Sequence, residues 1–392
     1  MKAKPVVVDM FCGAGGEFQG IAQAAEKAGI TIQAYAINHW ERAIETHRYN
    51  FPAAEHICRD VADIYPPDLV PGRNINLLWM SPECTNHSPA RGDKPMNNQS
   101  RCSAFTLFDW IDKMTVDRVI VENVPAFENW GPLDEGTKRP IKGREGETFK
   151  AWLAMIRSFD FTVDYRKLNA ADYGAPTSRN RLFVQAVRNG SGKSILWPEP
   201  SHAQPSPNRV LTQELPRWIP AREIINWNLP SESIFSRRRP LAERTMGRIR
   251  EGLVRFGGSE FLICMEHGGR VVSADVPVPT ITTAKGGAIG VAQPFIVEYY
   301  GNGKARSVSD PLPTVTARDR FALIEPRQDN GIDVRFRMLT PNELAAAQSF
   351  PSKYVFTGTR EEVVKQIGNA VCPKIAEALT YNYMKEIAAI EA

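Results

Sequence analysis

Cysteine is scarce in this chain, and its few copies are scattered. Among the 392 residues there are six cysteines, and no two of them have the close spacing of a metal-binding pair. That lack of pairs argues against a zinc knuckle, and the scatter fits reduced thiols better than a disulfide framework. The cysteines are Cys12, Cys58, Cys84, Cys102, Cys264 and Cys372.

Long apolar runs and strong charge are also missing. No segment reaches the roughly 18 consecutive apolar residues of a membrane span, and the N-terminus lacks the apolar stretch of a signal peptide. We therefore expect an intracellular, cytoplasmic protein with no membrane partner. The net charge of +4 is mild, so it is compatible with nucleic acid without indicating it. Arginines nevertheless gather in one stretch, from Arg237 to Arg255.

The first half of the chain alternates apolar strands with amphipathic helices. The pattern predicts strands over 6–10, 32–37, 76–79, 118–121, 162–166 and 181–187, and helices over 18–29, 40–50 and 146–159. Such a βαβα order is typical of an α/β fold with a doubly wound, mainly parallel sheet.

The alternation stops after Arg188, where short strand-like runs between Gly and Pro turns replace it. This region holds a repeat, because Pro-Val-Pro-Thr-Ile-Thr at 277–282 recurs as Pro-Leu-Pro-Thr-Val-Thr 34 residues later, at 311–316. Each copy follows a Gly-rich turn and a β-rich run that opens with Phe. We therefore predict two related β-hairpin units.

The α/β pattern returns at Arg335. Thr340-Pro341-Asn342-Glu343 resembles a capping box with Pro at the first helical position, and it predicts a helix to about Ser349. A last helix is expected over 373–389. We predict one α/β domain, residues 1–189 plus 335–392, interrupted by an inserted domain, residues 190–334.

Two predicted strand ends carry reactive groups. Cys84 follows the apolar run 76–79 in a loop with Pro, Asn and Ser, and Glu122 and Asn123 follow the run 118–121. Open α/β sheets bind ligands outside the carboxyl ends of their strands. We therefore expect a nucleophilic thiol and a carboxylate to face one crevice.

A glycine-rich turn, residues 9–16 (DMFCGAGG), joins the first strand to the first helix. Glycines let the backbone approach a ligand closely, and a helix N-terminus favours negative charge. The spacing is not the G-x-G-x-x-G of dinucleotide sites. By itself the turn leaves open a dinucleotide, a flavin, S-adenosylmethionine or a plain tight turn.

Taken together, six segments resemble the DNA cytosine-5 methyltransferase family and follow its order. They are DMFCGAGGEFQG (9–20), SPECTNHS (81–88), ENV (122–124), YGAPTSRNR (173–181), RMLTPNELAAAQSFP (337–351) and QIGNAVCP (366–373). The resemblance implies a Rossmann-like, S-adenosylmethionine-dependent methyltransferase domain. It also implies that residues 190–334 form a smaller, β-rich target-recognition domain.

The resemblance implies the catalytic residues as well. Cys84 would add to C6 of cytosine, because a thiolate at C6 pushes electron density onto the otherwise unreactive C5. Glu122 would hydrogen-bond N3 and the exocyclic amine, and Arg179 and Arg181 would steady the O2 side of the base. A base inside a duplex is out of reach, so the target must flip out.

A second set of residues is implied to hold S-adenosylmethionine: Phe11 against the adenine, Gly13 and Gly15 near the methionine end, Asn38 at the ribose, Asp60 at the adenine amine and Asn369 in the closing wall. Asn38 stands where the family usually has an acidic residue, so it would bind the ribose without charge assistance. No metal is expected.

Glu83 stands where the family usually has Pro, and a carboxylate beside a thiol opposes thiolate formation. This departure, with Asn38, supports one alternative, a DNA-binding homologue with impaired catalysis. A second alternative is a tRNA cytosine-5 methyltransferase, although the long inserted region argues against it. The main expectation is a monomer that methylates a short sequence of double-stranded DNA in a bacterial or phage-infected cell. A cognate restriction endonuclease acting on the same site is a possible partner.

Overall fold

A computed structural model of the protein describes residues 4–70, 72, 74–82, 103–137, 139–204, 215–230, 232–233, 238–240, 243, 261–264, 270–280, 289–293, 295–298, 305–307, 321–323 and 335–391. Cys84, the second repeat copy at 311–316 and most of the arginine run from Arg237 to Arg255 lie outside these described residues.

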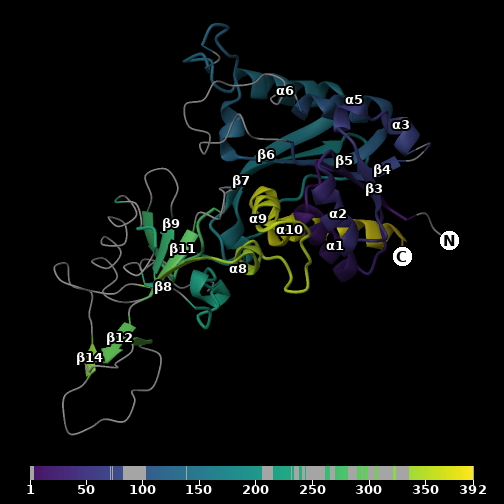
Figure 1. Ribbon diagram of the computed structural model, residues 1–392. Coiled ribbons are helices and arrows are strands. Elements are labelled where there is room, and N and C mark those ends of the chain that lie inside the picture. Colours follow the sequence, from purple (N-terminus) through teal and green to yellow (C-terminus); the bar gives the residue numbers. More distant parts are fainter. Residues whose placement is uncertain are drawn as a thin grey trace.

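A seven-stranded sheet with the order β3-β2-β1-β4-β5-β7-β6 forms the centre of the molecule (Figure 1). Its strands are β1 (Val6–Met10), β2 (Gln33–Asn38), β3 (Glu55–Cys58), β4 (Asn74–Met80), β5 (Thr115–Asn123), β6 (Phe161–Asn169) and β7 (Asn180–Arg188). Within this sheet β7 runs antiparallel to both of its neighbours, and all the other pairings are parallel. The predicted α/β fold with a doubly wound, mainly parallel sheet is confirmed.

Helices cover both faces of this sheet (Figure 1). One face packs against α3 (Pro66–Leu69), α5 (Thr106–Lys113) and α6 (Glu147–Ser158), and the other against α1 (Gly16–Ala28), α2 (Glu41–Asn50) and α10 (Pro373–Glu391). Strand β1 shows why the sequence has three consecutive valines, Val6 to Val8. Val6 and Val8 belong to the core under α5 and α6, whereas Val7 belongs to the core under α1 and α10.

The two ends of the chain meet in the layer formed by α1 and α10. Gly20 of α1 allows this close approach, because a Cβ there would lie 2.4 Å from the carbonyl oxygen of Pro373. The last helix therefore packs beside α1 on the same face of the central sheet. Residues 373–391 thus belong to the same α/β unit as residues 6–188.

The described strands of the region after Arg188 form two smaller antiparallel sheets. One has the order β10-β9-β11-β15-β8 and the other the order β13-β12-β14. Their bounds are β8 (Glu232–Ser233), β9 (Phe261–Cys264), β10 (Arg270–Ser273), β11 (Ile289–Gln293), β12 (Phe295–Glu298), β13 (Ala305–Ser307), β14 (Phe321–Leu323) and β15 (Arg335–Met338). In Figure 1, β12 and β14 lie farther from the central sheet than β9 and β11 do.

The strand pairing confirms the two related hairpins. Strand β9 pairs with β10, and Phe261 lies opposite Ser273. Strand β12 pairs with β13, and Phe295 lies opposite Ser307, which is the same register after a shift of one repeat. A third strand then joins each hairpin on its other side, β11 in the first and β14 in the second.

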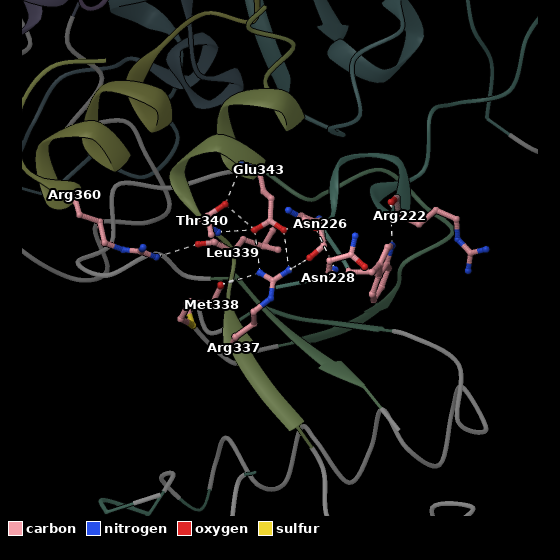
Figure 2. A network of polar contacts seen from close by, with 10 residues as sticks. Arg222, Asn226, Asn228, Arg337, Met338, Leu339, Thr340, Glu343 and Arg360 are labelled. Atoms are coloured by element: carbon pink, nitrogen blue, oxygen red, sulfur yellow. Dashed lines mark hydrogen bonds and ion pairs between the residues drawn. The ribbon is translucent and has the colours of Figure 1, made fainter. Parts of the chain in front are cut away.

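A polar network joins the region after Arg188 to helix α8 (Pro341–Ala347) (Figure 2). The predicted capping box is confirmed, since the side chains of Thr340 and Glu343 bond each other's backbone N–H groups. The buried Glu343 carboxylate also pairs with Arg337 (2.8 Å) and accepts from the backbone N of Asn226 (2.8 Å). Arg337 donates in turn to the carbonyl of Asn226 (2.8 Å). One carboxylate thus links β15, α8 and the segment around residue 226.

Candidate active site

The carboxyl ends of β4 and β5 lie side by side at one edge of the sheet. Met80 is paired with Val121, and Ser81 and Glu122 each follow one residue later. The backbone N of Ser81 also donates to the carbonyl of Met10 at the end of β1 (3.1 Å). The edge predicted to carry the chemistry is therefore formed by β1, β4 and β5.

Asn123 fastens the start of the Cys84 loop to this edge. Its Nδ2 donates to the carbonyl of Pro82 (3.2 Å), and its Oδ1 accepts from the backbone N of Val124 (2.9 Å). Cys84 itself lies outside the described residues. The anchored Ser81 and Pro82 are the described residues from which the chain leads to it.

Glu122 forms an ion pair with Arg181. The Nε of Arg181 lies 3.0 Å from Oε1 of Glu122, and both side chains are nearly buried. Burial raises the pKa of Glu122 above its ordinary value, while Arg181 and Arg179 oppose that rise. Three of the four predicted catalytic residues therefore come together, although Glu122 belongs to β5 and Arg181 to β7.

Residues from the region after Arg188 hold the segment that carries these arginines. Residues 277–280, the described part of the first repeat copy, lie against residues 175–178. The backbone N of Val278 donates to the carbonyl of Pro176 (2.7 Å), and the backbone N of Ser178 donates to the carbonyl of Val278 (2.9 Å). Val278 is fully buried. The repeat is thus part of the support for the arginine loop.

The glycine-rich turn adopts a backbone that few side chains tolerate. Gly13 and Gly15 have φ angles of +49° and +84°, and Phe11, which is not a glycine, has a φ of +61°. Positive φ in a bulky residue is uncommon and tends to occur at functional sites. The turn follows β1 at the same edge as Ser81.

The aromatic side chains of His47 and Tyr354 pack against this turn. A Cβ on Gly15 would lie 2.8 Å from the ring of His47 and 2.9 Å from the hydroxyl of Tyr354, so only glycine fits. Tyr354 donates to the carbonyl of Ala14. The ring of His47 packs against that of Phe18 at a tilt of 52°, and burial together with the neighbouring His56 lowers the pKa of His47 to about 3, which keeps it neutral.

The three remaining predicted cofactor residues lie around the same edge. Asn38 ends β2, and its Oδ1 accepts from the backbone N of Trp40 (2.8 Å). Asp60 follows β3, is exposed, and accepts from the backbone N of Ala62 (3.0 Å). Asn369 is the exposed last residue of α9 (Arg360–Asn369). The carbonyl of Val371, two residues later, borders Gly16 at the start of α1.

Two buried acids, for which the sequence predicts no role, also lie here. Asp9 of β1 is fully buried, and neither of its carboxylate oxygens has a hydrogen-bond partner among the described residues. Glu17, in the first turn of α1, is 2% exposed. Burial and the nearby Glu122 raise the pKa of Glu17 to about 8. The available signal was an acid next to the glycine turn, on a helix face that is otherwise apolar.

No group of His, Cys, Asp or Glu suited to a metal ion occurs among the residues that the structure describes. Within the same part of the chain, no helix combines the length and apolar character needed to cross a membrane.

Known proteins resemble the chain along nearly its whole length. M.XorII, a type II methyltransferase of Xanthomonas oryzae pv. oryzae, is 25% identical over 400 residues, covering 98% of this chain and 85% of that protein. M1.HphI, a type II methyltransferase of Haemophilus parahaemolyticus, is 23% identical over 382 residues, covering 96% and 86%.

Solved structures share the fold. A mutant DNMT2 of Spodoptera frugiperda superposes with a TM-score of 0.58 at 17% identity, covering 97% of this chain and all of that one. The methyltransferase EhMeth of Entamoeba histolytica gives a TM-score of 0.56 at 16% identity, covering 98% and 99%.

The sheet order and the paired strand ends agree with what a comparison of the sequence alone finds. Residues 6–385 match the family described as C-5 cytosine-specific DNA methylase. The chain belongs to the C-5 cytosine-specific DNA methylases.

Proposed function

We propose that the protein transfers a methyl group from S-adenosylmethionine to C5 of cytosine in a short sequence of double-stranded DNA. The observation that carries this proposal is the Glu122–Arg181 ion pair at the strand edge where Asn123 anchors Pro82. A carboxyl and a guanidinium are thereby held next to the first residues of the loop that leads to Cys84.

The residues at the edge fit S-adenosylmethionine. The positive φ angles of Phe11, Gly13 and Gly15 open the backbone of the turn, and the fully buried Asp9 carboxyl below it has no partner among the described residues. When bound, the cofactor supplies an activated methyl group. Phe11 would hold the adenine, Gly13 and Gly15 the methionine end, Asn38 the ribose, Asp60 the adenine amine and Asn369 the closing wall.

The chain's own residues would activate the cytosine. The Cys84 thiolate adds to C6 of a base flipped out of the duplex, and this addition makes C5 nucleophilic. The Glu122 carboxyl hydrogen-bonds N3 and the exocyclic amine, so that charge which develops on the ring is stabilised. Arg181 orients Glu122, and Arg179 and Arg181 bound the O2 side. Loss of the C5 proton and of the thiol restores the aromatic ring.

For the whole chain we propose the division made from the sequence. Residues 1–189 plus 335–392 would form the catalytic domain, and residues 190–334 would recognise the DNA target. The similarity to type II methyltransferases supports a role beside DNA in a bacterial or phage-infected cell. A restriction endonuclease that acts on the same site would then be the cognate partner. The proposed form is a monomer.

The decisive experiment traps the covalent step. The full-length protein, S-adenosylmethionine and DNA containing 5-fluorocytosine should give an adduct that resists denaturation, because fluorine at C5 blocks release of the thiol. Cys84→Ser should abolish the adduct, and Cys58→Ser, which changes an exposed cysteine, should leave it intact. An adduct that persists in Cys84→Ser would refute the assignment of the nucleophile.

A companion assay identifies the substrate. Methyl transfer from labelled cofactor is measured in parallel on mixed-sequence duplex DNA and on tRNA. Incorporation into DNA is expected, and bisulfite sequencing of the product then reports the target site. Incorporation into tRNA alone would overturn the DNA proposal in favour of the RNA alternative. Cofactor binding without transfer to either would favour a homologue with impaired catalysis.

A further inference from the structure

Glu17 lies near both the catalytic carboxylate of Glu122 and Ser81. It is in the first turn of α1, on the face of the sheet toward which Glu122 also points. Its carboxyl is hydrogen-bonded to the side chain of Ser81 and lies close enough to Glu122 and Arg179 to interact with both. Ser81 Oγ accepts from Nε1 of Trp79 (3.1 Å), which leaves the Ser81 hydroxyl proton for Glu17.

The space around Glu17 contains more acids than bases. The groups that interact with it are Asp9 of β1, Cys12 of the glycine-rich turn, Glu122 of β5, Arg179 before β7 and Tyr354 before α9. With Arg181 beside Glu122, two guanidinium groups of the described residues face three carboxyls. A buried carboxylate without a charged partner is strongly disfavoured, so the acids that lack one keep their protons.

The contacts decide which carboxyl ionises first. Glu122 has Arg181 at 3.0 Å, whereas Glu17 has the neutral Ser81 hydroxyl and only a weaker attraction from Arg179, and Asp9 has no hydrogen-bond partner among the described residues. The charged form is therefore best stabilised at Glu122. Burial raises the pKa of Glu17 to about 8 and that of Asp9 well above its ordinary value, so a proton remains next to Glu122 at neutral pH.

We propose that Glu17 is a positioning residue that keeps a proton beside Glu122, so that Glu122 can present a proton to N3 of the target base. The inference rests on the proposed function. As the Cys84 sulfur bonds to C6, the electron pair of the C5–C6 double bond moves into the ring and N3 gains a lone pair that can be protonated. The Glu17 proton passes to the Glu122 carboxylate, and Glu122 gives a proton to N3, so that the negative charge is left on the carboxyl pair. When the thiol leaves, N3 returns its proton to the two carboxyls, so no proton is consumed.

The test replaces Glu17 with an isosteric side chain that cannot titrate. Glu17→Gln can still accept from the Ser81 hydroxyl, but Glu122 must then hold the proton alone between two arginines. Each profile of kcat against pH is scaled to its own maximum. The alkaline limb of Glu17→Gln should lie at a pH lower by about one unit, because the essential proton is lost earlier. Glu26→Gln, an exposed change on the same helix, should keep the wild-type profile.

A second readout needs no activity. A carboxyl whose pKa is about 8 in the folded protein and ordinary in the unfolded chain stabilises the fold below its ordinary pKa. That contribution is lost as the pH rises toward 8. The unfolding temperature of the wild type should therefore fall relative to that of Glu17→Gln between about pH 5 and pH 8, and that of Glu26→Gln should follow the wild type. Infrared titration of the wild type should show a protonated carboxyl that ionises around pH 8, even if the variant does not fold.

The outcomes separate this inference from the function on which it rests. If the wild type methylates DNA but Glu17→Gln shows the same scaled profile, Glu17 has only a structural role. If neither the unfolding temperatures nor the infrared spectra reveal a titrating group, no proton is held there and the proposal is wrong. If the wild type transfers no methyl group at any pH, the proposed function fails instead, whatever the titration shows.

Discussion

Glu122 and Asn123, the last residues of β5, have different roles because successive side chains of a strand point to opposite faces of the sheet. Glu122 points toward the α1 side and pairs with Arg181, whereas Asn123 holds Pro82 and Val124. Sequence resemblance predicts Glu122, Arg179 and Arg181. It could not predict Glu17, because the importance of that acid depends on being buried beside residues that are distant in the sequence.

At this scale we expect Glu122→Gln to remove most of the activity. An amide keeps the size of the side chain but has no acidic proton to give to N3, so the rate of methyl transfer should fall by about 100-fold or more. Single-turnover kinetics measure this rate, and calorimetry of cofactor binding checks that the variant is folded.

A matched control lies just beyond the strand. Glu128 pairs with Lys167 at the surface, and Glu128→Gln should transfer methyl groups at the wild-type rate. A rate for Glu122→Gln within a few-fold of the wild type would contradict the role given to Glu122.

The elements of the central sheet follow from local pattern, but their partners do not. The predicted helix over 40–50 is α2 (Glu41–Asn50), and the predicted capping box begins α8. No helix was predicted over residues 360–369, which form α9. Thr359 and Glu362 nevertheless have the same spacing as the first capping box and form a second one. The reversed direction of β7 was not predicted either, because direction depends on which strands it lies between.

The contact between the repeat and the arginine loop gives an expectation for single elements. Val278→Asp would place a charge at a fully buried position, which costs about 3 kcal/mol or more, and should displace residues 175–178. Since this segment leads to Arg179, methyl transfer should fall more than the loss of folded protein explains. Thermal unfolding and the transfer rate of the remaining folded protein separate the two effects.

Val276 offers the control for that variant. It belongs to the same segment, two residues earlier, and its side chain is 40% exposed. Val276→Asp should leave both the unfolding temperature and the transfer rate near the wild type. Equal losses in the two variants would show that the segment responds to charge in general and not to the buried contact.

At the scale of the whole molecule, the net charge of +4 is mild for a protein that binds the polyanion DNA. The positive charge that attracts DNA must therefore be concentrated in one part of the surface. Arg238 and Arg239 are described and exposed, at the start of the arginine run. Changing both to Gln should weaken DNA binding and make it less dependent on salt. Each lost phosphate contact should lower the slope of log affinity against log salt by about 0.9.

Salt titrations of DNA binding by fluorescence anisotropy measure that slope. Lys150 and Arg157 are exposed on α6, which covers the sheet face opposite α1 and α10, and together they carry the same charge as Arg238 and Arg239. Changing both of those to Gln should leave the slope unchanged. An equal fall in both double variants would mean that overall charge, not the arginine run, binds the DNA.

By itself, the sequence determined the α/β class, the glycine turn after β1, the repeated hairpins and the family, since each depends on local periodicity or on short ordered segments. Only the tertiary structure decided that β7 is reversed, that Val278 supports the arginine loop, that Asp9 and Glu17 are buried and that Glu17 lies near Glu122. Those features depend on which distant segments meet, because burial and the pairing of charges are set by neighbours in space.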